Sequence, residues 1–153
     1  MKKIRSLITG CMTIGAATML SSAHAATPTS MRVAAEVIND AAQDLHMTFA
    51  SWDRQGTELS SRLIPAQQSG TIIKLTFGNP RNGAATFRYA TAEGKSCEFK
   101  LAHVARFSWF SLNPAPEKSA SARSIGAVQA ECRGVVTAGS ESLGSYTVRF
   151  SMK

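Results

Sequence analysis

Three cysteines, Cys11, Cys97 and Cys132, give this chain its most readily interpreted covalent chemistry. Cys11 lies in an N-terminal segment that we expect to be cleaved, so the two that remain have one possible intramolecular pairing. Neither belongs to a Cys-x-x-Cys motif, which disfavours a redox-active dithiol. We therefore predict a structural disulfide between Cys97 and Cys132. It closes a loop of about 36 residues and should stabilise the fold by roughly 3–4 kcal/mol on the chain-entropy model.

The N-terminal segment has the layout of a bacterial secretory signal peptide. Lys2, Lys3 and Arg5 precede an uncharged, mainly apolar run over 6–20, and a small-x-small cleavage site, Ala-His-Ala, follows at 23–25. A transmembrane anchor would need about 20 apolar residues. A lipoprotein signal would need the apolar run to precede its cysteine, whereas most of it follows. We expect cleavage after residue 25 and a periplasmic or secreted product, in a compartment where disulfides persist.

Two histidines, His46 and His103, are the remaining candidates for acid–base chemistry, and each alternates with apolar neighbours. The sequence has no Gly-x-Ser-x-Gly or His-Glu-x-x-His motif. Asp40, Asp44 and Asp53 lie near His46, but their spacing matches no known metal-binding loop. We predict a protein without catalytic activity, metal or cofactor, and keep a small periplasmic hydrolase as an alternative.

Aromatic residues supply the candidate binding residues. Phe107, Trp109 and Phe110 follow Arg106 within four positions. On a strand, Trp109 shares a face with Phe107 and packs in the core, or else Trp109 or Phe110 is exposed beside Arg106. An exposed aromatic there would suit a contact with a ligand, a protein or a membrane surface. Trp52, which is followed by an Asp-Arg pair, is a second candidate of the same kind.

The charge of the chain is mildly basic. The leader holds three of the 17 basic residues and none of the ten acidic ones, so the net charge falls from +7 to about +4 after cleavage. Basic residues are spread along the chain, whereas a nucleic-acid-binding protein would concentrate them on one element. We expect an evenly charged surface that binds no nucleic acid.

The elements that must position these residues are strands. Four segments alternate apolar and polar residues, and four more do so less clearly, which indicates about eight half-buried strands. The clear segments are 71–77, 84–90, 95–101 and 145–152, and the weaker ones are 32–38, 45–52, 104–110 and 125–132. The apolar residues over 30–45 also have a spacing that a helix could accommodate. Asn39-Asp40 and several β-branched residues favour a strand and a turn there instead.

The segments between the strands are rich in turn residues. Residues 78–83 form a dense turn cluster, 92–94 close a short hairpin, and the Pro/Ala/Ser-rich stretch 113–123 should be a mobile excursion. The fold class we predict is all-β. A single domain over 26–153 should form an antiparallel β-sandwich or barrel-like sandwich with its disulfide inside the core.

The N-terminal half of this domain resembles small secreted cytolysin-like β-sandwich proteins of the aegerolysin and actinoporin kind. The resemblance covers about 50 residues, in which a strand ends in Asn and a Pro-then-Gly turn precedes the next strands. It rests on residues 36–40 (EVIND), 43–45 (QDL), Gly56, 63–65 (LIP), 69–70 (SG) and 83–84 (GA). The chain departs from the pattern by its disulfide, and no lipid-headgroup residues can be matched. The resemblance implies a β-sandwich, and it makes a membrane-active, cytolysin-like protein an alternative expectation for function.

These observations favour a small exported monomer that acts by binding another protein, an envelope component or a host surface. The membrane-active, cytolysin-like protein is the first alternative, and a hydrolase is the second.

Overall fold

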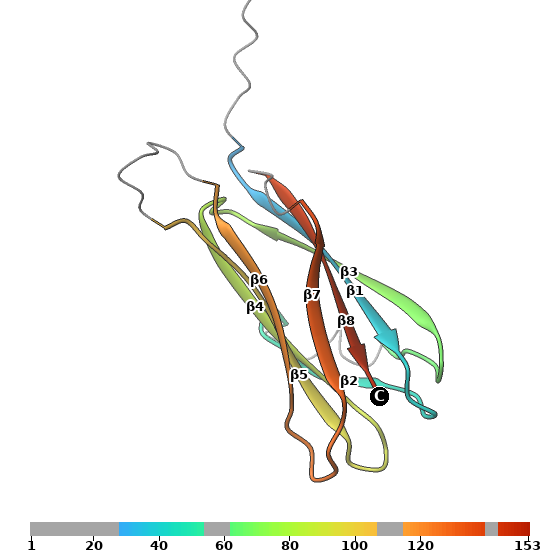
Figure 1. Ribbon diagram of the computed structural model, residues 1–153. Helices are drawn as coiled ribbons and strands as arrows, with labels where there is room; N and C mark the ends of the chain where they lie inside the picture. Colours follow the sequence, from blue (N-terminus) through green and yellow to red (C-terminus); the bar gives the residue numbers. More distant parts are fainter. Residues whose placement is uncertain (1–27, 54–61, 107–114, 140–143) are drawn as a thin grey trace, which may run out of the picture.

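The computed structural model describes residues 28–53, 62–106, 115–139 and 144–153, so the predicted signal peptide lies outside the described residues. Eight strands form two four-stranded sheets that pack face to face (Figure 1). This confirms the predicted all-β sandwich and shows the segment 30–45 as strand and turn. The strands are β1 (Met31–Asn39), β2 (His46–Ala50), β3 (Ser69–Phe77), β4 (Asn82–Ala90), β5 (Ser96–Val104), β6 (Glu117–Ser124), β7 (Cys132–Ala138) and β8 (Ser145–Met152).

One pair of strands departs from the predicted antiparallel arrangement. The first sheet has the order β3-β1-β8-β7 and the second the order β2-β4-β5-β6. All neighbours are antiparallel except β1 and β8, which run parallel over eight residue pairs, from Arg32 opposite Ser145 to Asn39 opposite Met152. The alternation of side chains along a strand is the same in both orientations, so the sequence pattern carries no sign of this parallel pair.

The core lies between the two inner faces and centres on aromatic rings. Phe87, Phe99 and Phe150 are fully buried, and their ring centroids lie 5.0–5.4 Å apart. Phe87 and Phe99 come from neighbouring strands of one sheet, and Phe150 comes from β8 of the other. The predicted alternation is therefore confirmed in β4, β5 and β8, where every second side chain faces the opposite sheet.

The prediction of a mobile loop over 113–123 is wrong from residue 117 on; residues 113–114 lie outside the described residues. Residues 117–124 form β6, which pairs with residues 97–104 of β5. Its inward positions include Ala120 and Ala122, which pack against the core. Small side chains suit this strand because β6 lies against β7: a Cβ added at Gly134 of β7 would lie only 3.3 Å from the Ser121 backbone. Residues 117–124 therefore form a strand because they pack closely between β5 and β7, although their sequence lacks the large apolar residues that indicate a strand.

Two weaker strand predictions are displaced. Residues 125–131 form a turn and loop, and β7 begins only at Cys132. Val128, which a strand over 125–132 would place on the same face as Cys132, is exposed. The predicted strand 104–110 is wrong at its start, because β5 ends at Val104 and residues 105–106 lie outside any strand. Residues 107–110 lie outside the described residues.

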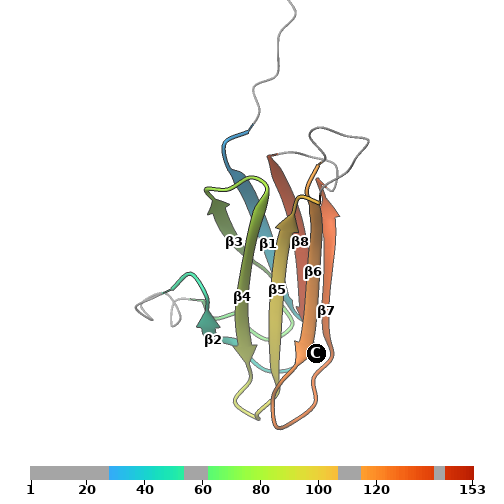
Figure 2. The same ribbon diagram turned by 90° about the vertical axis from the view of Figure 1, so that its left-hand side faces the viewer.

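The sandwich is closed along one side. β6 and β7, the border strands of the two sheets, lie next to each other on this side (Figures 1 and 2). On the other side the borders are β2, which is five residues long, and β3, which has nine residues. β3 is thus the longest border strand, and beyond β1 it pairs with no strand that the structure describes.

A buried asparagine fixes the lower end of the molecule. The Asn39 side chain donates to the backbone carbonyls of Gln43, Ile64 and Pro65 at 2.8–3.0 Å, and its Oδ1 accepts from the Ala41 N–H at 2.9 Å. Asn39 is 1% exposed. It therefore ties the end of β1 to the two loops that flank β2, which holds that short strand in place.

Candidate functional site

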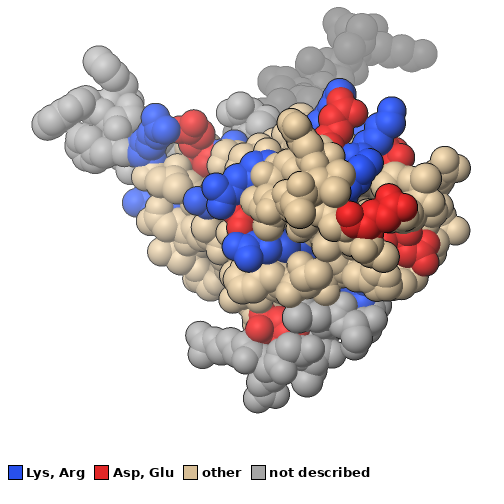
Figure 3. All heavy atoms as spheres, turned by 90° about the horizontal axis from the view of Figure 1, so that it is seen from below, with Lys and Arg blue, Asp and Glu red and all other residues tan. Residues whose placement is uncertain are grey.

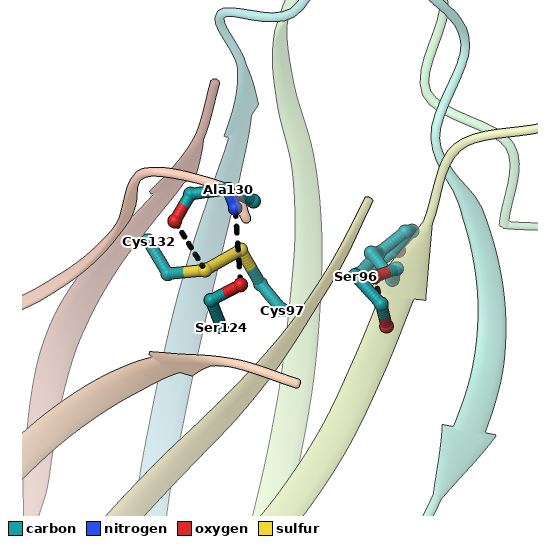
Figure 4. The surroundings of a disulfide bond; sticks show 6 residues. Ser96, Cys97, Ser124, Ala130 and Cys132 are labelled. Carbon is teal, nitrogen blue, oxygen red and sulfur yellow. Dashed lines mark hydrogen bonds between the residues drawn. A yellow bond between two sulfur atoms is a disulfide. The ribbon is translucent and has the colours of Figure 1, made fainter. Parts of the chain in front are cut away.

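The disulfide predicted from the sequence is present. Cys97 of β5 and Cys132 of β7 are joined, with their Cα atoms 5.8 Å apart. The bridge links the two sheets, and Cys97 is fully buried. Beside it the Ala130 N–H donates to Ser124 Oγ at 3.0 Å, and Cys132 Sγ lies 3.8 Å from the Ala130 carbonyl oxygen (Figure 4). Its burial and its position between the two sheets are those of a structural disulfide.

Two of the four candidate binding residues lie within the described residues, and they lie apart. Trp52 follows β2 and is partly buried against the core, with its ring edge-on to Phe87 at a centroid distance of 5.7 Å. Arg106 lies beyond the end of β5, where it forms an exposed ion pair with Glu117 at 2.6 Å. Trp109 and Phe110 lie outside the described residues.

The two histidines have different surroundings. His46 is exposed on β2. His103 is fully buried in β5, where its ring contacts Phe77 and Tyr146 at centroid distances of 5.0 and 5.9 Å. Its Nε2 lies 3.1 Å from the carbonyl oxygen of Asn79, a distance at which a protonated Nε2 donates to that oxygen. These aromatic and backbone contacts are those of a core residue.

The face with most binding potential is the outer face of the β3-β1-β8-β7 sheet, which we call the outer β3–β7 face. The outward positions of its four strands carry four basic residues and one acidic residue, Glu36. Glu36 accepts a hydrogen bond from Arg149 Nε at 2.7 Å. The three other basic residues are Arg32, Lys74 and Arg133, of which Arg133 pairs with Glu131.

Arg32 and Lys74 form a cation pair on this face. Arg32 lies opposite Thr76 in the β1–β3 ladder, and Lys74 lies opposite Ala34, so the two basic side chains occupy diagonal positions of neighbouring strands. Such positions are roughly 7–8 Å apart. Among the residues that the structure describes, no carboxylate forms an ion pair with either of them. Glu36 lies at the other position diagonal to Lys74, but it bonds to Arg149. The cation pair therefore keeps a net positive charge that favours binding of an anion.

A shallow open cavity of about 360 Å³ lies beside the cation pair. It is lined by residues of all four strands of this sheet, and its lining is mainly apolar. The lining includes Arg32, Ala34, Lys74, Thr76, Ala138 and Thr147. A mainly apolar lining beside cations suits a group that carries both aliphatic and anionic parts.

Exposed aliphatic residues lie further along the same face. Ile72 of β3 and Val135 of β7 are 58% and 54% exposed. They lie in one row across the sheet, with Glu36 and Arg149 between them, since Ile72 is opposite Glu36 and Val135 is opposite Arg149. The outer β3–β7 face thus combines accessible apolar area with a surplus of positive charge.

Other surfaces carry more balanced charges. On the outer face of the second sheet, Glu98 lies between Arg88 and Arg123 and bonds to both, at 2.9 and 2.8 Å from their Nε atoms. These hydrogen bonds hold the pKa of Glu98 below its usual value. At the lower end of the sandwich, basic and acidic side chains are interspersed (Figure 3). Lys100 on the outer face of the second sheet is a single exposed lysine that forms no ion pair with a described carboxylate, whereas two such cations lie side by side on the outer β3–β7 face.

Sequence reasoning missed the cation pair. Arg32 and Lys74 are 42 positions apart, and only the register of β1 with β3 brings them together. The expectation of an evenly charged surface followed from spacing along the chain, which does not measure spacing across a sheet. The available signal was that both residues occupy outward positions of predicted strands.

Comparisons with known proteins leave the geometry as the basis for the functional argument. No family model and no curated protein matches this chain. No segment that the structure describes forms the long apolar helix that crosses a membrane.

Proposed function

We propose that this protein is an exported binding module, and that its outer β3–β7 face binds a protein of the cell envelope or of a host surface. The proposal is carried by two features that lie on one face. Ile72 and Val135 are each more than half exposed, and the Arg32–Lys74 cation pair forms no ion pair with a described carboxylate. Exposed aliphatic side chains beside a net positive charge offer a partner both apolar contact and charge complementarity. The disulfide between the sheets supports function in an oxidising compartment.

A protein partner is favoured over a membrane by the side chains of this face. Proteins that bind at membrane interfaces commonly place Trp and Tyr there. The outward positions of β1, β3, β7 and β8 hold aliphatic, hydroxyl and charged residues and, within these four strands, no aromatic one. The membrane-active function implied by the resemblance stays the alternative.

A matched pair of double variants tests the proposal. I72S/K74E removes an exposed aliphatic residue and reverses a charge on the outer β3–β7 face, whereas V104S/K100E makes the same changes on the outer face of the second sheet. Val104 and Lys100 are both exposed in β5. The oxidised protein would be immobilised and exposed to envelope extract and to host-surface proteins, with thermal unfolding as the check on folding.

We expect the wild type and V104S/K100E to capture the same partner, and I72S/K74E to lose it. The proposal would be contradicted if I72S/K74E still captured the partner, or if both double variants lost it equally. Co-sedimentation with anionic vesicles at low salt tests the alternative: lipid binding that only I72S/K74E abolishes would identify the face as a membrane-binding surface instead.

A further inference from the structure

The free border of β3 lies directly beside the cation pair. β3 is hydrogen-bonded to β1 on one side, and alternate N–H and C=O groups along it point away from β1, as in any border strand. From Thr71 to Phe77 its pairing is regular, since the register shift lies at Val37/Ile38. A regular stretch of seven residues can pair with one further strand.

We infer that the partner binds as an extended, acidic segment that adds a strand to the border of β3, with its carboxylates facing Lys74 and Arg32. This inference rests on the proposed function and specifies the partner's chemistry. Added strands gain affinity from main-chain hydrogen bonds and specificity from alternate side chains. Here the outward side chains of β3 that would face the partner are Ile72, Lys74 and Thr76.

Charge disfavours a second copy of this chain as the occupant. β3 contains no acidic residue, and Lys74 lies near its middle. An antiparallel pairing of two β3 strands about their centres would place the two Lys74 side chains on one face, at opposite or diagonal positions, with both Arg32 side chains behind them. Like charges at such positions are destabilising. A segment with glutamate or aspartate at alternate positions would instead place negative charges beside Lys74, and the electrostatic interaction would then be favourable.

The distances across the sheet predict which cation contributes more. A strand added to β3 lies about 4.8 Å from β3 and about twice that from β1. Lys74 is on the adjacent strand, whereas Arg32 must reach across Thr76. Lys74 should therefore contribute the larger part of the affinity for an acidic segment, and Arg32 a smaller part.

A nine-residue peptide of alternating valine and glutamate is a suitable probe. Fluorescence anisotropy would measure its binding to the oxidised protein, with K74E, R32E and the control K100E compared with the wild type. We expect about a tenfold weaker affinity for K74E, a loss of about threefold for R32E and no change for K100E, effects typical of charge-assisted contacts at a sheet surface. A valine–lysine peptide should bind K74E more tightly than the wild type.

Backbone pairing has its own readout. The valine–glutamate peptide with proline at two adjacent central positions, a valine and a glutamate, should fail to bind. One of two adjacent residues donates its N–H to β3 in either register, and proline lacks that donor. Hydrogen exchange should show that the intact peptide protects amides of β3 and leaves those of β2 unchanged. Absence of binding at millimolar peptide, an equal effect of K74E and K100E, or protection on another border strand would overturn the inference.

The two proposals can fail separately. If I72S/K74E loses the captured partner but the peptide does not bind, the outer β3–β7 face is functional and the added strand is wrong. If the peptide binds as expected but captured proteins are indifferent to I72S/K74E, the border accepts strands without serving the proposed function. A dimer of the wild-type protein with protected β3 amides would show that the occupant is a second copy, which contradicts the inference.

Discussion

At the scale of single residues, the buried polar groups divide into satisfied and unsatisfied ones. Asn39 makes hydrogen bonds with four backbone groups. By contrast, His103 Nδ1 and the hydroxyls of Tyr89 and Tyr146 have no hydrogen-bond partner among the described residues. Asn39 therefore stabilises the lower loops, whereas the unsatisfied atoms each carry a desolvation cost.

Replacing Asn39 should be strongly destabilising. N39A leaves the Gln43 carbonyl and the Ala41 N–H without the partner that Asn39 supplies. The Ile64 and Pro65 carbonyls each lose one donor and keep a backbone N–H. We expect the variant to lower the free energy of unfolding by about 2–4 kcal/mol. N79A is the matched control, because Asn79 Oδ1 accepts hydrogen bonds from the backbone N–H groups of Arg81 and Asn82 in an exposed turn. Its effect should stay below about 1 kcal/mol. Urea denaturation of the two variants measures both values, and an equal loss would contradict the role given to Asn39.

At the scale of strands, the sequence pattern predicted the elements that bury alternate large side chains. β4, β5 and β8 were predicted almost to their bounds because each places aromatic or aliphatic residues at every second position. β6 was missed because its inward residues, such as Ala120 and Ala122, are too small to produce a hydrophobic alternation. Its strand conformation depends on β5 and β7, which a local pattern does not include.

The cysteine bridge connects two of these strands and should account for a large share of the stability. C97A/C132A removes a link across a separation of 35 residues, and we expect it to lower the free energy of unfolding by about 3–4 kcal/mol. Urea denaturation of the oxidised wild type and the double variant measures the difference. Equal midpoints would show that the bridge does not restrict the unfolded chain. Since Cys97 is fully buried, reduction of the native protein by dithiothreitol should also be slow.

At the scale of the whole molecule, the sandwich is asymmetric. Its closed side carries β6, β7 and the disulfide, and its open side carries β3 and the cation pair. The sequence predicted the disulfide and the layers, but the functional face depends on register and strand order. Lys74 could be assigned to an outward position from alternation alone. Its proximity to Arg32 required the pairing of β1 with β3.

Global stability should fall steeply at alkaline pH. Burial raises the pKa of Tyr89 and of Tyr146 from 10.0 to about 12. A group whose pKa is raised by folding contributes stability that is fully present below its unfolded pKa and is lost as the pH rises through its folded pKa. The stability contributed by the two tyrosines should therefore be present below pH 10 and lost between about pH 10 and 12.

Thermal unfolding between pH 8 and 12, followed together with tyrosinate absorbance, measures this effect. The double variant Y89F/Y146F lacks both ionisable groups and should show a flatter dependence on pH above 10. Folded wild-type protein whose tyrosines all ionise near pH 10 with no loss of stability would contradict the prediction.

The parallel pairing of β1 with β8 has a consequence for synthesis. The first strand of the domain and the last occupy the middle of the same sheet, and β7 is attached to that sheet only through β8. A nascent chain therefore lacks one of the two central strands of this layer until β8 leaves the ribosome. Until then β1 has only β3 beside it and β7 has no neighbour in its sheet, so we expect a chain that lacks β8 not to complete this layer.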